Sequence, residues 1–215
     1  MIKTSLVINS KNPKAVWLEQ CIESAQAFDE IVLYIDGEKY SSLSNRSKVV
    51  FVGDGKERNI GQGLNYAIAQ ATGNWICPFC DDDYFHKDAL DKLIHNLKLG
   101  LYNTHDIVHG TVSLDNGGTW GSSKVSLEAI LASNLVPFGS FYKREVFERL
   151  KGYSETVGAY NDWNFWIRAA KENFKFKFFD MPLYHFRQGH ESATVRLLKE
   201  IGGHGEAVNE VLKNA

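Results

Sequence analysis

Cysteine is scarce in this sequence, with three residues, Cys21, Cys77 and Cys80, among 215. Three cysteines cannot form a full disulfide framework, and they exclude a zinc site made of four thiolates. Cys77 and Cys80 have the spacing of a redox or metal pair. The apolar residues around them nevertheless favour two small side chains in a buried strand.

An excess of charge of one sign is also lacking, because 24 basic and 26 acidic residues leave a formal net charge of -2. Proteins that hold nucleic acid by its phosphates carry a basic surface, so DNA or RNA is not expected as a main ligand. The sequence has no run of about 18 apolar residues, and Met1 leads into TSLVIN without a signal-peptide pattern. A chain without a transmembrane segment and with a cytoplasmic location is expected.

The length of 215 residues, with 44% hydrophobic and 13% aromatic residues, is enough for one α/β domain with a proper core. We therefore expect a single domain over residues 1–215. Residues 194–215 read as a C-terminal helical tail that Gly202, Gly203 and Gly205 interrupt. Such a tail is compatible with a connection to a further domain.

Apolar periodicity predicts strands and helices in alternation over the first half of the chain. Expected strands are 4–9, 31–36, 48–52 and 74–80, and expected helices follow Pro13 and cover 61–72 and 88–99. Alternation of this kind predicts a mainly parallel, doubly wound sheet flanked by helices. Later segments are less regular, with strands expected at 106–113 and 138–143 and helices at 144–150 and 162–172. Ligands of open α/β sheets bind at the carboxyl ends of strands, so polar residues there are the first candidates for chemistry.

Three carboxylates, Asp81, Asp82 and Asp83, directly follow the apolar segment WICPFC. If the strand continues, its period of two places Asp81 and Asp83 on one side and Asp82 on the other. Such a pair can share a cation, and a few oxygen ligands suit Mg²⁺ or Mn²⁺, which take their remaining ligands from water and substrate phosphates. The alternative is a solvated turn whose acidic side chains cap the next helix.

Several segments resemble the GT-A fold glycosyltransferases of the family 2 type. They include LEQCIES at 18–24, EIVLYIDG at 30–37, Asn59-Ile60-Gly61, Asn65, and ATGNWI at 71–76 before the acidic residues. The resemblance extends in order and spacing from about residue 4 to residue 192. It implies a GT-A fold: a mixed, mainly parallel sheet flanked by helices. It also implies that the acidic residues bind a metal and a sugar nucleotide.

Residue roles follow from this resemblance. Asp83 with Asp81 is expected to hold the metal, and the donor is expected to contact the residues that match the family's donor segments. These donor-binding residues are Asp36, Asn65, Asp81, Asp82, Arg187 and His190. Asp36 would read the base and favour uridine. Arg187 and His190 belong to YHFRQGHES at 184–192, which resembles the closing motif of the family. His185 in this segment is a second candidate for the metal.

Asp162 matches the catalytic aspartate of the family, which takes a proton from the acceptor hydroxyl opposite the departing diphosphate. An Asp before a helical run can also be a simple N-cap. Asn161 stands where the family usually has Glu. Trp163 is expected to stack on the acceptor sugar, whereas Trp166 is expected in the core.

Together these features predict a metal-dependent enzyme that moves a hexose from a UDP-sugar, UDP-glucose or a related UDP-hexose, to a hydroxyl of a glycan or other acceptor. The resemblance implies inversion at the sugar carbon and Mn²⁺ or Mg²⁺ as cofactor. Three departures from the family pattern touch the donor pocket, namely Asn9-Ser10, Ile35 and Leu64. The alternative is a catalytically silent module that binds a nucleotide sugar within a larger protein.

Overall fold

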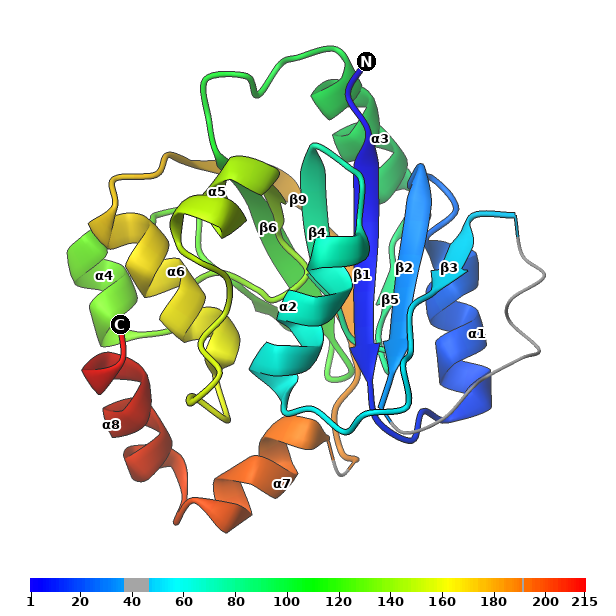
Figure 1. The fold of residues 1–215 in the computed structure, drawn as a ribbon. Helices are drawn as coiled ribbons and strands as arrows, with labels where there is room; N and C mark the ends of the chain where they lie inside the picture. The colour runs from blue at the N-terminus through cyan, green and yellow to red at the C-terminus, as the bar shows by residue number, and fades with distance from the viewer. Residues whose placement is uncertain (37–46, 191) are drawn as a thin grey trace.

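A computed structural model describes residues 1–36, 47–190 and 192–215. Gly37 and Glu191, which belong to segments that resemble the family, lie outside this part. The described residues form one mixed sheet with helices on both faces (Figure 1). Its strands are β1 (Thr4–Ser10), β2 (Glu30–Ile35), β3 (Val49–Phe51), β4 (Trp75–Phe79), β5 (Tyr84–Phe85), β6 (Ile107–Leu114), β7 (Thr119–Trp120), β8 (Phe141–Lys143) and β9 (Phe176–Phe186). Its helices are α1 (Ala15–Ser24), α2 (Ile60–Gln70), α3 (Lys87–Lys98), α4 (Leu127–Ala132), α5 (Arg144–Arg149), α6 (Asn161–Lys171), α7 (Ala193–Glu200) and α8 (His204–Lys213).

The strand order is β3-β2-β1-β4-β8-β6-β9-β5, with β7 paired to β6. β1 runs parallel to β2 and β4, and β2 runs parallel to β3. β8 is antiparallel to both β4 and β6, whereas β6 and β9 are parallel. The mixed, mainly parallel α/β sheet is therefore confirmed.

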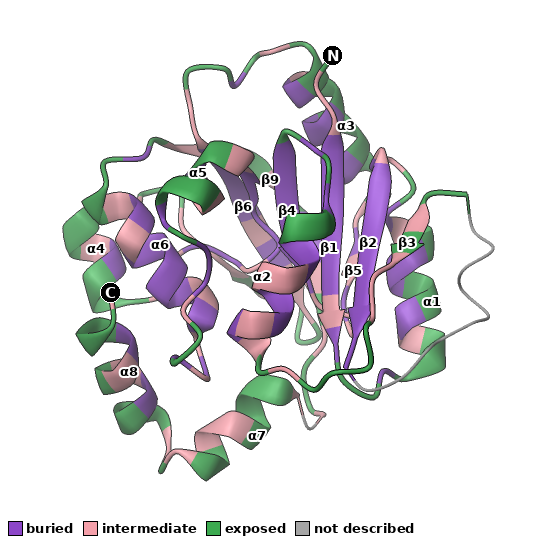
Figure 2. Ribbon diagram, viewed as in Figure 1, coloured by how far each residue is buried: buried purple, intermediate pink, exposed green. Residues whose placement is uncertain are grey.

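The core consists of two apolar layers, one on each face of the sheet (Figure 2). Along β1 the period of two sends Leu6 and Ile8 into the layer with α1 and α3, and Val7 into the layer with α2 and α6. All three side chains are fully buried. The alternation of α and β elements in the sequence therefore corresponds to helices that cover both faces of one sheet.

The start of α2 is fixed by its own sequence and lies close against other segments. Asn59 accepts a hydrogen bond from the Gln62 amide at 2.9 Å, and the Gln62 side chain accepts one from the Asn59 amide at 3.2 Å, which forms a capping box. A Cβ on Gly61 would lie 2.0 Å from the Ser154 carbonyl oxygen. Glycine is therefore required there for the segment around Ser154 to approach the helix.

Some elements differ from the expectations. β9 was not predicted, and neither were α4 and the short strands β5 and β7. The strand before the acidic residues ends at Phe79, with Asp81 and Asp82 in a turn. The expected C-terminal tail is two helices, of which α8 packs on α6 through buried Ala207 and Val211. None of the helices in the described part is both long and apolar enough to cross a membrane.

Candidate active site at the carboxyl edge of the sheet

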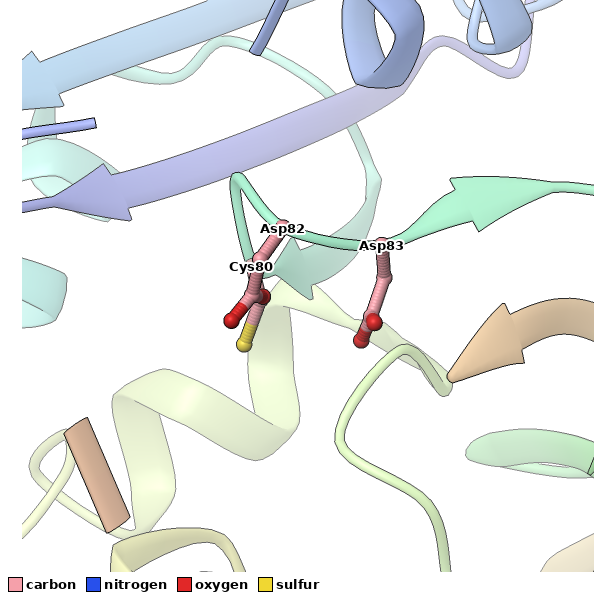
Figure 3. A group of neighbouring side chains, drawn as sticks. All are labelled: Cys80, Asp82 and Asp83. Atoms are coloured by element: carbon pink, nitrogen blue, oxygen red, sulfur yellow. The ribbon is translucent and has the colours of Figure 1, made fainter. Parts of the chain in front are cut away.

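The acidic residues lie where β4 leaves the sheet and turns toward β5. The strand stops at Phe79, so its period of two does not reach the carboxylates, and the condition for pairing Asp81 with Asp83 by strand alternation is not met. Instead, ligand atoms of Cys80, Asp82 and Asp83 all lie within 4.8 Å of one another. Figure 3 shows the three side chains pointing to the same side of the turn. The turn thus brings together a thiol and two carboxylates.

His190 lies against this group. Its Nε2 is 2.8 Å from Oδ2 of Asp82, and its ring meets the Trp17 ring edge-on at 4.9 Å between centroids. The Nδ1 atom is buried and has no hydrogen-bond partner among the described residues. The structure therefore brings His190 together with Asp82, across 108 residues of sequence.

Arg187 connects the end of β9 to the acidic turn and to α1. Its backbone N–H donates to Oδ1 of Asp83 at 2.9 Å, and its guanidinium donates to the Asp82 carbonyl and to Oε1 of Gln20. The guanidinium carbon also lies 5.0 Å from the Tyr84 ring centroid and 5.2 Å from that of Trp17. A fixed positive charge therefore stands beside the carboxylates.

Burial and mutual repulsion destabilise the ionised carboxylates of the acidic turn. Burial raises the pKa of Asp83 to about 8, and the charge of Asp82 adds to the effect, although the Arg187 amide opposes it. Burial and the charge of Asp82 also raise the pKa of Asp81, to about 6. A cation bound at the turn would favour the ionised carboxylates and reverse these shifts.

Asp36 ends β2 at the same edge of the sheet. It is 5% exposed, and its Oδ1 accepts a hydrogen bond from the Arg58 amide at 3.0 Å. Nζ of Lys11 lies 3.1 Å from the other carboxylate oxygen. Next to these residues is an open hollow of about 450 Å³, lined by Lys56, Glu57, Arg58, Gln62, Asn65, Tyr66 and Glu155.

Arg58 is a residue of this hollow that the sequence did not single out. Its guanidinium stacks 4.0 Å from the centroid of the Tyr66 ring and forms two hydrogen bonds to Asp54, at 2.6 and 2.7 Å. Leu64, which replaces the family's Arg, is fully buried. The guanidinium of Arg58 thus places a positive charge in the hollow, from a position six residues before Leu64.

Asn65 lines the hollow, but its amide group is already in use. Nδ2 donates to the Tyr153 carbonyl at 3.0 Å, and Oδ1 accepts from the Tyr153 amide at 2.8 Å. Its contacts in the structure are therefore structural, and its expected contact with a donor stays a prediction.

Asp162 lies in the first turn of α6 and is not the N-cap, which is Tyr160 in the left-handed conformation with φ 59°. Its Oδ2 accepts a hydrogen bond from Nδ2 of Asn134 at 3.0 Å. Burial raises the pKa of Asp162, and the Asn134 hydrogen bond offsets part of that rise. Burial and the carboxylates of the acidic turn raise the pKa of Cys80, and the charge of Asp162 adds to this effect, so Asp162 lies within electrostatic range of the turn. Asn134 carried no signal in the sequence.

The surroundings of Trp163 and His185 differ from those that the expected roles require. Trp163 is 5% exposed, and its indole N–H donates to the Ile130 carbonyl at 2.6 Å, which leaves no open ring face for an acceptor sugar. Trp166 is fully buried, as expected. His185 directs Nε2 to Asp115 at 2.7 Å and Nδ1 to Ser113 at 3.2 Å, so it does not join the acidic turn.

Comparison with known proteins agrees with this geometry. The family model described as Glycosyl transferase family 2 matches residues 5–202. A protein of Bacillus subtilis (strain 168), described as the uncharacterized glycosyltransferase YwdF, is 28% identical over 130 residues, which cover 54% of this chain and 47% of that protein.

Two solved structures have the same fold. TarS 1-349 of S. aureus, in complex with UDP-GlcNAc, matches with a TM-score of 0.72 and 16% identity, over 90% of this chain and 60% of that one. The mannosyltransferase PcManGT from Pyrobaculum calidifontis, in complex with GDP-Man and Mn²⁺, matches with a TM-score of 0.71 and 14% identity, over 100% of this chain and 65% of that one. This chain therefore spans about half the length of the curated relative and less than two thirds of these two.

Proposed function

Because this chain belongs to glycosyl transferase family 2, we propose that it transfers a hexose from a UDP-sugar to a hydroxyl of a glycan or other acceptor. UDP-glucose or a related UDP-hexose is the proposed donor. The observation that carries the proposal is that the acidic turn, His190 and Arg187 meet at one edge of the sheet, with Asp162 within electrostatic range, although these residues lie far apart in the sequence.

A divalent cation, Mn²⁺ or Mg²⁺, fits the acidic turn. We now propose Asp83 with Asp82 as its carboxylate ligands and His190 beside them, since these groups face one another and Asp81 is not in the group. The raised pKa of Asp83 supports a cation at the turn, since burial and the charge of Asp82 destabilise the ionised carboxylate. When bound, the cation would offset charge on the diphosphate leaving group.

The donor would lie along the edge between Asp36 and Arg187. The Asp36 carboxylate can accept an N–H of the uracil base, and its ion partner Lys11 is half exposed and can move aside. Asp81, Asp82 and Asn65 would contact the rest of the donor, and Arg187 would stabilise negative charge on the phosphates. Solved relatives contain UDP-GlcNAc in one case and GDP-Man in another, so the choice of base is a separate test.

Asp162 would act as the general base in an inverting transfer. In a single displacement the base removes the proton of the acceptor hydroxyl on the face opposite the leaving group. Burial raises the pKa of Asp162, which brings it closer to neutral pH and improves it as a proton acceptor.

The test combines donor binding with turnover. Calorimetry with UDP-, GDP-, CDP- and dTDP-sugars in Mn²⁺ identifies the donor, and release of UDP with candidate acceptors measures transfer. Asp162→Asn should lower kcat by about 10²–10⁴-fold and leave donor affinity within about twofold. Asp180→Asn, on the exposed part of β9, is the matched control.

Three outcomes are informative. Unchanged turnover in Asp162→Asn rejects this residue as the base. An NMR spectrum that shows retention of anomeric configuration rejects the inverting mechanism. Donor binding without transfer to any acceptor supports the alternative, a silent nucleotide-sugar-binding module of a larger protein.

A further inference from the structure

Cys80 places a soft sulfur ligand next to the proposed cation site. We propose that Cys80 binds the divalent ion together with Asp82, Asp83 and His190, and that the site therefore prefers thiophilic ions such as Zn²⁺, Co²⁺ and Cd²⁺ to Mg²⁺. This inference deepens the proposed function and rests on the cation site described there.

The geometry fits a single ion. Protein ligands lie about 2.0–2.3 Å from zinc, so two ligands of one ion are at most about 4.6 Å apart. The ligand atoms of Cys80, Asp82 and Asp83 already lie within 4.8 Å of one another, and their side chains point the same way (Figure 3). Small side-chain rotations are enough to close the site around an ion.

The burial of polar groups at the turn also points to a ligand. Asp83 is 2% exposed and lies beside a second carboxylate, and Nδ1 of His190 is buried without a hydrogen-bond partner among the residues that the structure describes. Buried carboxylates that close together are costly without a proton or a cation. Nε2 of His190, 2.8 Å from Asp82, is near enough to be a fourth ligand after a small rotation.

The three cysteines differ in what they do. The Cys21 thiol donates to the Cys80 carbonyl at 3.4 Å, and the Cys77 thiol lies 3.4 Å from the Gly139 carbonyl, both in the core. The Cys80 thiol has no such hydrogen bond within the described part of the chain, and the residue as a whole is less buried than the other two cysteines. Of these thiols, Cys80 is therefore the one that is placed to coordinate.

Ligand type decides which ion the site prefers. On binding, the Cys80 thiol releases its proton to solvent, and the thiolate forms the bond to the metal. One thiolate, one imidazole and carboxylate oxygens suit zinc, whereas magnesium selects oxygen ligands and keeps several waters. Four protein ligands would leave no position for a diphosphate, so Zn²⁺ is expected to inhibit transfer.

Cobalt provides a direct test, because a thiolate bound to Co²⁺ adds a charge-transfer absorption in the near ultraviolet. The purified chain is titrated with Co²⁺, and binding is followed in parallel by absorption and calorimetry. The band should appear in the unchanged protein and in the control Cys77→Ala, and it should be absent in Cys80→Ser. Cys80→Asp should reduce the preference for Zn²⁺ over Mg²⁺ by about tenfold or more.

The outcomes separate this inference from the proposed function. Co²⁺ binding without the band, or with the same band in Cys80→Ser, overturns the role of Cys80 but leaves a cation site. Failure of every divalent ion to bind, with and without UDP, overturns both. If Cys80→Ser does not fold, alkylation of the unchanged protein at alkaline pH decides: bound Zn²⁺ must protect Cys80, as mapped by mass spectrometry, and unprotected Cys80 rejects the inference.

Discussion

The two halves of the sheet position their polar side chains by different means. In the half that contains β1, β2 and β4, parallel strands end at one edge, so Asp36 and the acidic turn are brought together by strand register. In the other half, Asp162 lies in the first turn of a helix, and Arg187 and His190 follow a strand. Individual hydrogen bonds across more than 100 residues hold the last two in place. Strand pairing therefore positions Asp36 and the acidic turn, whereas single contacts position Arg187, His190 and Asp162. We call the surroundings of Asp162 the reaction side.

The largest effect on turnover is expected from a substitution of Asp82, where the acidic turn of one half meets His190 of the other. Asp82→Ala removes a proposed cation ligand and the partner of His190. Turnover should fall about a thousandfold or more, since a catalytic metal contributes several kcal/mol to transition-state stabilisation. Calorimetry should show donor binding that no longer depends on Mn²⁺. Asp88→Asn, exposed at the start of α3, is the control, and Mn²⁺-dependent binding in Asp82→Ala would show that this carboxylate is not a ligand.

A single contact on the reaction side should control the pH dependence. A base works only when ionised, so kcat/KM should be full above the raised pKa of Asp162 and should fall as the pH drops through it. Asn134→Ala removes a hydrogen bond that lowers this pKa, so the loss of activity should occur at a higher pH. The pH–rate profile measures the shift, with Asn209→Ala on the exposed face of α8 as control. An identical acid limb in Asn134→Ala would exclude this coupling.

A substitution of Trp163 tests whether this residue stacks on the acceptor sugar or only packs in the core. Trp163→Phe loses the hydrogen bond to Ile130 and should lower the free energy of unfolding by about 1–3 kcal/mol, measured by urea denaturation. The KM for the acceptor should not change. Trp120→Phe in the short strand β7 serves for comparison. A higher acceptor KM with unchanged stability would support the stacking role.

The smallest effect is expected from a substitution at the N-terminus of α2, which contacts segments of both halves. Asn59→Ala removes the capping box of α2, and its Nδ2 hydrogen bond to the Glu155 carbonyl is lost as well. The free energy of unfolding should fall by about 1 kcal/mol. Gln70→Ala, exposed at the other end of α2, should change stability much less. Equal effects of the two substitutions would argue against the cap.

The sequence predicted most of the strand-register half because its signals are local. Alternation along 4–9 and 31–36 and the helical spacing after Pro13 indicate buried faces directly. β9 was missed although Phe174, Phe176 and Phe178 alternate with lysines. Pro182 and the register shifts of its pairing with β6 break the period of two in the second part of this strand.

The side chains whose surroundings differ from the expectations share a cause. Which of Asp81, Asp82 and Asp83 face one another depends on where β4 stops, and no local pattern marks Phe79 as the last strand residue. Trp163 and Trp166 are three residues apart on one helix and both are buried, Trp163 against α4 and Trp166 against Tyr142 of β8. Asn134 could not be identified, since its partner Asp162 is 28 residues away.

The side-chain amide of Asn65 links the two halves, because it pairs with the backbone of Tyr153 as another backbone amide would. It offers Tyr153 a donor and an acceptor together, much as a neighbouring strand would, and Asn161 then binds the carbonyls of Ser154 and Val157 at 2.7 and 2.8 Å. Two side-chain amides, those of Asn65 and Asn161, thus connect the wall of the hollow to the helix of Asp162. If a ligand in the hollow moved α2, these hydrogen bonds would carry the movement to the start of α6, where the Asp162 carboxylate lies.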